Sequence, residues 1–146
     1  MLFSRINRSN PEKIYLVVKA EEALLKGRPV CMHFTGTDDG LLAATANAAT
    51  DATMVVGLAD AAIASGDYGL VQCYGYRSDA QCINGSDAAA ACGAIMAVGS
   101  ASSGYLYMSV SLGAATAIQP AFVMANTASK TTSATLYEQS VFIRCM

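Results

Sequence analysis

The chain has 146 residues, of which 53% are hydrophobic and only 14% are charged, and its formal net charge is −2. This length predicts a single domain with a sizeable core. The slight negative charge and the lack of a basic patch with interleaved aromatic residues argue against nucleic-acid binding.

The charged fraction is well below the roughly 25% of an ordinary soluble domain, so the chain either enters a membrane or covers much of its surface with partners. A membrane span is not expected, because the apolar run at 92–98 is interrupted by Gly93 and is far shorter than the roughly 20 residues that a spanning helix needs. A cleavable targeting segment is not expected either, since the polar residues Arg5, Asn7, Arg8, Ser9 and Asn10 follow Leu2 and Phe3. We therefore expect cytoplasmic synthesis.

Residues 1–13 are predicted to form an extended N-terminal arm, and residues 14–146 a single β-rich domain. Pro11 punctuates the arm. Residues 1–28 carry a net charge of +3 and the remainder −5, so the arm is suited to an acidic partner surface. Its apolar anchors and charge partners are Leu2, Phe3, Arg5, Ile6 and Arg8.

The first half of the domain is predicted to form short strands separated by turns. Strands are expected at 14–18 and 29–35, with a helical turn over 21–26 that Gly27 ends. A turn is expected at 37–40, and the alanine-rich residues 41–53 are interpreted as loop or short strand.

Residues 54–84 are the organising stretch of the chain. The stretch begins with an apolar run at 55–58, and a turn is expected at 65–67. A strand is expected over 68–76, which is rich in aromatic and β-branched residues. Alternation places Gly69, Val71, Cys73 and Gly75 on one face. Such a glycine face predicts a bend or the close approach of another backbone.

The second half lacks charge over 42 consecutive residues, Ala88 to Ser129. Short strands are expected there at 95–98, 105–110 and 122–124, and a last strand at 140–144. The spacing predicts a mainly β fold, a β-barrel or sandwich of short strands. The absence of charge favours a subunit interface, with Tyr105 and Tyr107 as candidate contact residues.

No catalytic, cofactor-binding or metal-ligating constellation is expected. The five cysteines (31, 73, 82, 92 and 145) show no C-x-x-C spacing and are interpreted as buried free thiols. His33 would share a strand face with Cys31, but neighbours on one strand seldom have the geometry of a base and nucleophile. The separated residues Asp60, Asp67, Asp79 and Asp87 are interpreted as turn formers.

Several segments resemble those of the head-decoration proteins (cement or capsid-stabilising proteins) of tailed bacteriophages. They are KGRPV at 26–30, DG at 39–40, VGLA at 56–59, ASGDYG at 64–69, VQCYG at 71–75 and VFIR at 141–144. The resemblance implies a β-rich, non-catalytic protein, a homotrimer that contacts the major capsid protein on the outer capsid surface of the virion. It implies neither a cofactor nor nucleic acid or membrane as a partner.

The leading hypothesis is therefore a cement subunit that stabilises the capsid. The alternative is another oligomeric β-structured virion component, such as a tail or fibre adaptor. A third alternative, a small ligand-binding β-barrel, would keep an apolar cavity and an ordinary charged exterior.

Overall fold

The computed structural model describes residues 12–33, 42–47, 54–83, 95–98, 104–108, 123–125 and 136–145. Within these ranges the chain forms strands and turns and contains no α-helix, so the prediction of a mainly β fold is confirmed. The strands are β1 (Ile14–Ala20), β2 (Pro29–Met32), β3 (Leu42–Thr45), β4 (Val55–Ala59), β5 (Tyr68–Ile83), β6 (Ile95–Ala97), β7 (Leu106–Met108), β8 (Val123–Ala125) and β9 (Leu136–Arg144).

The described strands form one sheet that closes on itself twice. The hydrogen-bonded order is β1-β3-β2-β4-β5-β7-β6-β8-β9, with additional pairings of β1 with β5 and of β5 with β9. The first five strands therefore form one ring and the last five another, and β5 belongs to both. The pairs β1–β3 and β5–β7 are parallel, and the other pairs are antiparallel.

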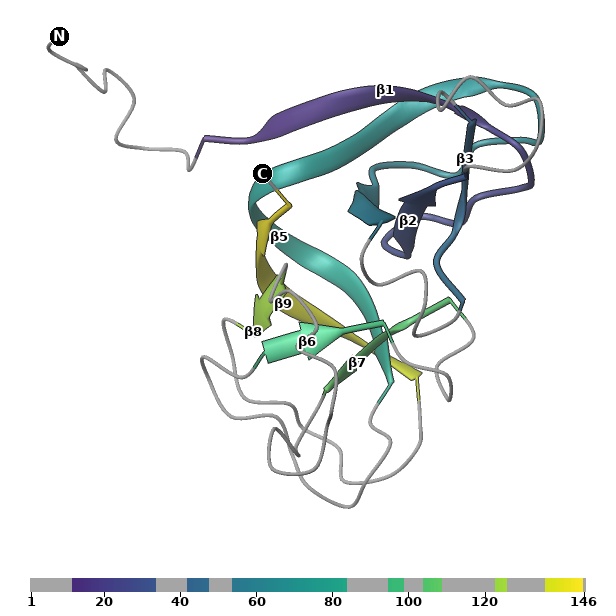
Figure 1. Ribbon diagram of the computed structural model, residues 1–146. Coiled ribbons are helices and arrows are strands. Elements are labelled where there is room, and N and C mark those ends of the chain that lie inside the picture. The colour runs from purple at the N-terminus through teal and green to yellow at the C-terminus, as the bar shows by residue number, and fades with distance from the viewer. Residues whose placement is uncertain are drawn as a thin grey trace, which may run out of the picture.

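Strand β5 runs the length of the molecule and connects the two rings (Figure 1). Its first half pairs with β1 and β4, and its second half pairs with β9 and β7. The sequence predicted that this strand would end at Tyr76, and that prediction is wrong, because the strand continues to Ile83. A register shift between Arg77 and Ala80 accommodates the polar residues that resemble a turn in the sequence.

The bend in β5 depends on a glycine, as the glycine face predicted. Gly75 has a φ of +102°, and a Cβ atom there would lie 2.2 Å from the carbonyl oxygen of Glu12. Gln72, almost fully buried, donates from Nε2 to the carbonyl oxygens of Tyr74 (3.2 Å) and Tyr76 (3.1 Å). The side chain thus satisfies carbonyl groups of its own strand around the bend.

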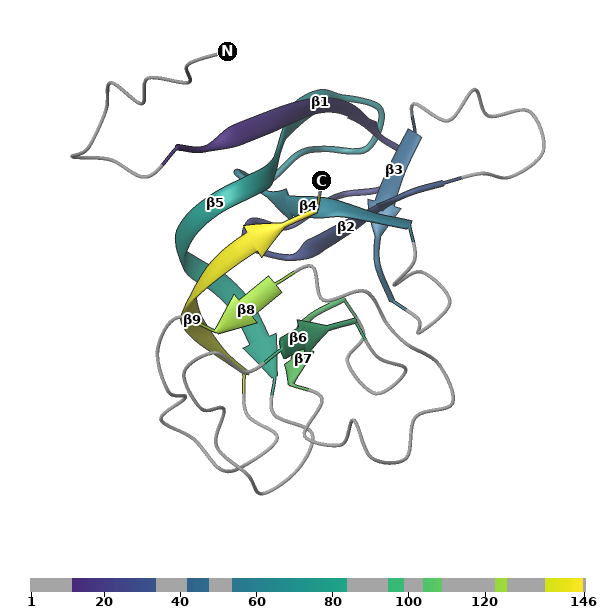
Figure 2. The same cartoon turned by 60° about the vertical axis from the view of Figure 1, so that its left-hand side comes forward.

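Two clusters of buried side chains fill the rings. The first comprises Val18, Ala20, Leu24, Val30, Ala43, Ala59, Ile63 and Val71, and the second comprises Cys31, Ala46, Leu58, Ala80, Cys82, Val98, Leu106, Val141 and Ile143. Neighbouring residues of one strand contribute to different clusters. In β2, Val30 belongs to the first cluster and Cys31 to the second, while in β4 Ala59 belongs to the first and Leu58 to the second. Strands β2 and β4 are therefore buried on both faces. In Figure 2 they lie between β1 and the strands β6 to β8. Strands of this kind are apolar throughout rather than alternating.

The segment before β2 also differs from its prediction. Residues 21–26 do not form a helical turn. Leu24 instead exchanges two backbone hydrogen bonds of 2.9 Å with Ile63, and both side chains are buried in the first cluster. Burial of Leu24 outweighs the weak local preference for a helix.

Candidate contact surface

The outer face of the β1–β5 pair carries exposed apolar side chains. Val17 is paired with Leu70, and Lys19 with Tyr68. Tyr15 lies two residues before Val17, on the same face. The exposed fractions are 39% for Tyr15, 60% for Val17, 72% for Tyr68 and 45% for Leu70. We call Tyr15, Val17, Tyr68 and Leu70 the contact surface.

The opposite face of the same two strands packs into the molecule over most of its length, although Leu16 on this face is 39% exposed. Val18, Ala20 and Val71 are at most 2% exposed and belong to the first buried cluster. Both faces of this strand pair are therefore apolar, and among the described residues the outer face is the one left largely exposed. An uncovered apolar patch of this kind is typical of a docking surface.

A hollow of about 260 Å³ borders the contact surface. Tyr68 and Leu70 belong to its wall, and small side chains from the segment between β4 and β5 form much of the rest. The lining residues are Asp60, Ala61, Ala62, Ile63, Ala64, Asp67, Tyr68, Gly69 and Leu70. The apolar side chains project beside a shallow hollow, and side chains of a partner could pack against the former and into the latter.

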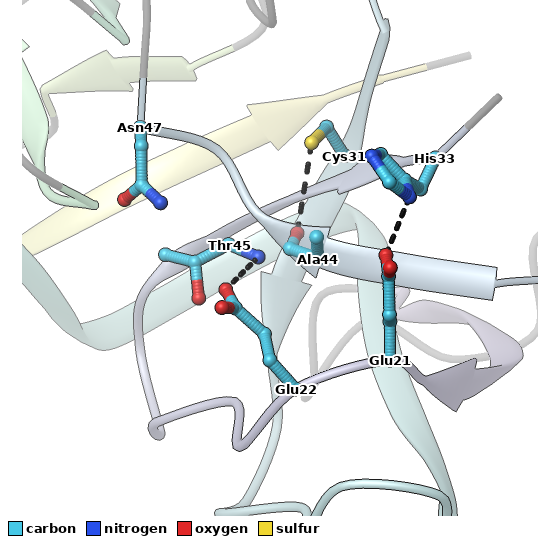
Figure 3. Close-up of a pocket in the computed structure, with 7 residues that line it drawn as sticks. All are labelled: Glu21, Glu22, Cys31, His33, Ala44, Thr45 and Asn47. Carbon is cyan, nitrogen blue, oxygen red and sulfur yellow. Dashed lines mark hydrogen bonds and ion pairs between the residues drawn. The ribbon is translucent and has the colours of Figure 1, made fainter. Parts of the chain in front are cut away.

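A second hollow, of about 450 Å³, lies where β2 and β3 meet the segment after β1 (Figure 3). Glu21 Oε2 lies 2.5 Å from His33 Nδ1, and Glu22 Oε1 accepts a hydrogen bond from the Thr45 amide at 3.0 Å. Cys31 directs its thiol to the Ala44 carbonyl oxygen at 3.6 Å. The lining is polar, unlike the apolar cavity expected of a small ligand-binding barrel.

Four charged side chains lie together beside the register shift of β5. Arg77, 3% exposed, contacts Asp79 at 2.7 Å and Asp60 at 3.6 Å, and Lys26 contacts Asp79 at 2.8 Å. Burial raises the pKa of Asp79, but the hydrogen bonds and charges of Lys26 and Arg77 together outweigh it and hold this pKa below its ordinary value. Asp79 therefore belongs to a strand and an ion-pair cluster, and its interpretation as a turn former is wrong.

The candidate contact residues of the N-terminal arm, Leu2, Phe3, Arg5, Ile6 and Arg8, lie outside the described residues. Of the two tyrosines named with them, Tyr105 comes directly before β7 and Tyr107 lies within it.

Tyr105 is half-buried and interacts within the chain. Its hydroxyl accepts a hydrogen bond from Arg28 Nη2, and the guanidinium carbon lies 4.2 Å from the ring centroid. The backbone of Tyr107 pairs with Ile83 and Ala97. A role for these tyrosines in capsid or subunit contact stays a prediction.

The sequence did not single out the contact surface, although a signal was present. Residues 14–18 are apolar at every position, so a strand formed there has two apolar faces. Only the pairing with β5 shows which of the two faces remains uncovered.

The prediction that the cysteines are buried is confirmed for Cys31, Cys73 and Cys82, whereas Cys145 is only half-buried. Burial raises the pKa of Cys82 to about 12. No group of three or more His, Cys, Asp or Glu side chains suited to a metal ion occurs among the described residues. That part of the chain also has no helix with the length and hydrophobicity to cross a bilayer.

No protein-family model matches the sequence, and no curated protein matches it. Among solved structures, the chain is similar to the N base of the head fiber protein gp8.5 of bacteriophage phi29. The TM-score is 0.52 at 16% sequence identity, and the match covers 92% of this chain and 96% of the other. At this identity the two chains share a fold.

Proposed function

We propose that this chain is a non-catalytic structural protein of a phage virion, a cement or decoration subunit that binds the outer surface of the capsid and stabilises it. The observation that carries the proposal is the fold shared with the base of a phage head fibre over 92% of this chain. The proposed partners are the major capsid protein and two further copies of the chain in a homotrimer.

The contact surface supports this proposal on physical grounds. Val17 and Leu70, directly opposite each other, are 60% and 45% exposed, and fully burying side chains of this size contributes about 1.5–3 kcal/mol each. Several such modest contacts per subunit, repeated over the subunits of an oligomer, give high avidity. A protein that must remain attached to a lattice needs this type of surface rather than one deep pocket.

A second candidate function is the base of a head fibre. The match covers 96% of the fibre base, so nearly all of that structure has a counterpart here. A fibre base and a cement subunit both have to attach to a shell. They differ in what they carry outward and in how many copies are present on each particle.

Counting copies on intact particles separates these functions. A cement subunit is expected in numbers comparable with those of the major capsid protein, whereas a fibre base or a tail adaptor is expected in far fewer copies. Quantitative mass spectrometry of purified particles gives this ratio. Absence of the chain from the particles would contradict both functions.

Substitution of the contact surface tests the mode of attachment. The double variant Val17→Lys with Leu70→Lys is expected to bind capsids about 10- to 100-fold more weakly, because two apolar side chains are replaced by charges that resist desolvation. Binding is measured by cosedimentation with capsids that lack the protein. Leu136→Lys is the matched control, since Leu136 is 49% exposed and pairs with Ile83 at the opposite end of β5. Unchanged binding by the double variant would contradict a role for this surface.

A further inference from the structure

The end of the last strand places two thiols opposite each other. Tyr74 of β5 is paired with Arg144 of β9 in an antiparallel register, so the preceding residue, Cys73, faces Cys145. The Cys145 amide donates to the Cys73 carbonyl oxygen at 3.0 Å, which confirms that the pairing extends to these two residues. In Figure 1 the C-terminal end of the chain lies beside the bend of β5.

This placement has the dimensions of a disulfide. Directly opposed residues joined by a backbone hydrogen bond have Cα atoms about 5.5 Å apart and side chains on the same face. Disulfides join residues with Cα atoms about 4.4–6.8 Å apart. Both residues are free cysteines, Cys73 buried and Cys145 half-buried.

We propose that Cys73 and Cys145 form an intramolecular disulfide that fastens the end of β9 to β5 when the protein meets a disulfide oxidant. With glutathione disulfide as the oxidant, the Cys145 thiolate attacks one glutathione sulfur and releases one glutathione. The Cys73 thiolate then attacks the mixed disulfide at Cys145 and releases the second. Two S–H bonds of the protein are lost and one S–S bond forms, while the S–S bond of the oxidant is reduced to two thiols.

Exposure decides the order of these steps. Cys145 is the more accessible thiol, whereas Cys73 is only 6% exposed. A chain held in a reducing cytoplasm keeps both thiols, and the same chain after release into an oxidising medium closes the bond. The disulfide is therefore absent in the reducing cytoplasm and present in the oxidising medium.

The surroundings of the two thiols also set the rate. Burial, with a smaller effect from the neighbouring Cys73, raises the pKa of Cys145 to about 12. Burial likewise raises the pKa of Cys73, partly offset by a hydrogen bond from the Leu16 backbone. Because the thiolate is the nucleophile, closure is slow at neutral pH and accelerates about tenfold per pH unit between about pH 7 and pH 9.

The test uses the reduced full-length protein, incubated with glutathione disulfide, quenched by alkylation and analysed by intact mass and peptide mapping. The expected product has lost two hydrogen atoms and yields one cross-linked peptide pair that contains Cys73 and Cys145. Cys145→Ser is expected to abolish this product. Cys31→Ser, a buried cysteine in another strand, is expected to leave the product unchanged.

Thermal unfolding gives a second readout. The bond closes a loop of roughly 70 residues, so the oxidised protein is expected to melt on the order of 10 °C higher than the reduced protein. Dithiothreitol should reverse the shift, and Cys145→Ser should show none. Persistence of both thiols at equilibrium, a stable glutathione adduct at Cys145 without closure, a different cysteine pair or a cross-linked dimer would each overturn the proposal.

Discussion

Gly75 shows how one residue shapes β5. A Cβ atom at this position would lie 2.2 Å from the Glu12 carbonyl oxygen, whereas a Cβ atom at Gly66 would have nothing within 4 Å. Both residues have positive φ, +102° at Gly75 and +84° at Gly66. Comparing the two positions separates the effect of backbone conformation from that of close approach.

We expect Gly66→Ala to lower the free energy of unfolding by about 1 kcal/mol, from the cost of a left-handed conformation. Gly75→Ala adds a backbone collision to this strain and is expected to cost about 2–4 kcal/mol. Urea unfolding followed by far-UV circular dichroism measures both values. Equal losses for the two variants would show that Glu12 moves away at little cost.

Between elements, the ion-pair cluster joins the turn before β2 to β5 and to the end of β4. Lys26 comes from the turn, Arg77 and Asp79 from β5, and Asp60 follows β4. The guanidinium of Arg77 is 3% exposed, so loss of an anionic partner leaves a buried charge poorly compensated. The cluster therefore stabilises the point where β5 passes from one ring to the other.

The Asp79→Asn variant is expected to lower the free energy of unfolding at pH 7 by about 2–3 kcal/mol, less than for a fully buried pair because Asp79 is partly exposed. The folded-state pKa of Asp79 lies below its ordinary value of 3.8. Its contribution is therefore complete above that value and is lost as the pH falls from 3.8 through the folded-state pKa.

Urea unfolding at pH 7 and at successively lower pH measures this dependence. The difference between the wild type and Asp79→Asn should shrink below pH 3.8. Asp67→Asn, a change at an exposed aspartate in the turn before β5, serves as the control. A difference that stayed constant down to low pH would show that the charge of Asp79 is not what stabilises the junction.

For the whole molecule, two rings that share one strand explain much of the low charge. Strands β2 and β4 contribute side chains to both buried clusters. Neither strand therefore has a solvent-facing side on which charged residues would be expected. Part of the apolar composition is therefore used inside the chain. The remainder includes the contact surface, where apolar side chains stay exposed.

Deletion of residues 1–10 tests the N-terminal arm at this scale. The truncated chain is expected to remain folded, because the described sheet begins at Ile14, and to form the proposed homotrimer. It is also expected to bind the shell poorly, since the deletion removes three apolar anchors and two arginines. Cosedimentation with capsids and analytical ultracentrifugation measure the two properties. Normal occupancy of shells by the truncated protein would contradict a role for the arm in attachment.

Much of the local structure could be predicted from residue types. The aromatic and β-branched run at 68–76 predicted a strand, and Ser65, Gly66 and Asp67 predicted the turn before it, which the hydrogen bond from the Asp67 amide to the Ala64 carbonyl oxygen confirms. The alternating glycines predicted a close backbone approach. The strand and the turn depend on neighbours in the chain, because conformational preference and turn geometry act over a few residues.

By itself, the sequence determined that the chain is β-rich, low in charge and supplied with apolar residues beyond the needs of one alternating sheet. Only the tertiary structure decided that β5 continues to Ile83, that it closes two rings, that Cys73 faces Cys145 and that one side of the β1–β5 pair stays uncovered. The physical reason is that strand pairing joins segments far apart in the chain. Register is chosen by the total burial of the sheet, to which local residue preference contributes little.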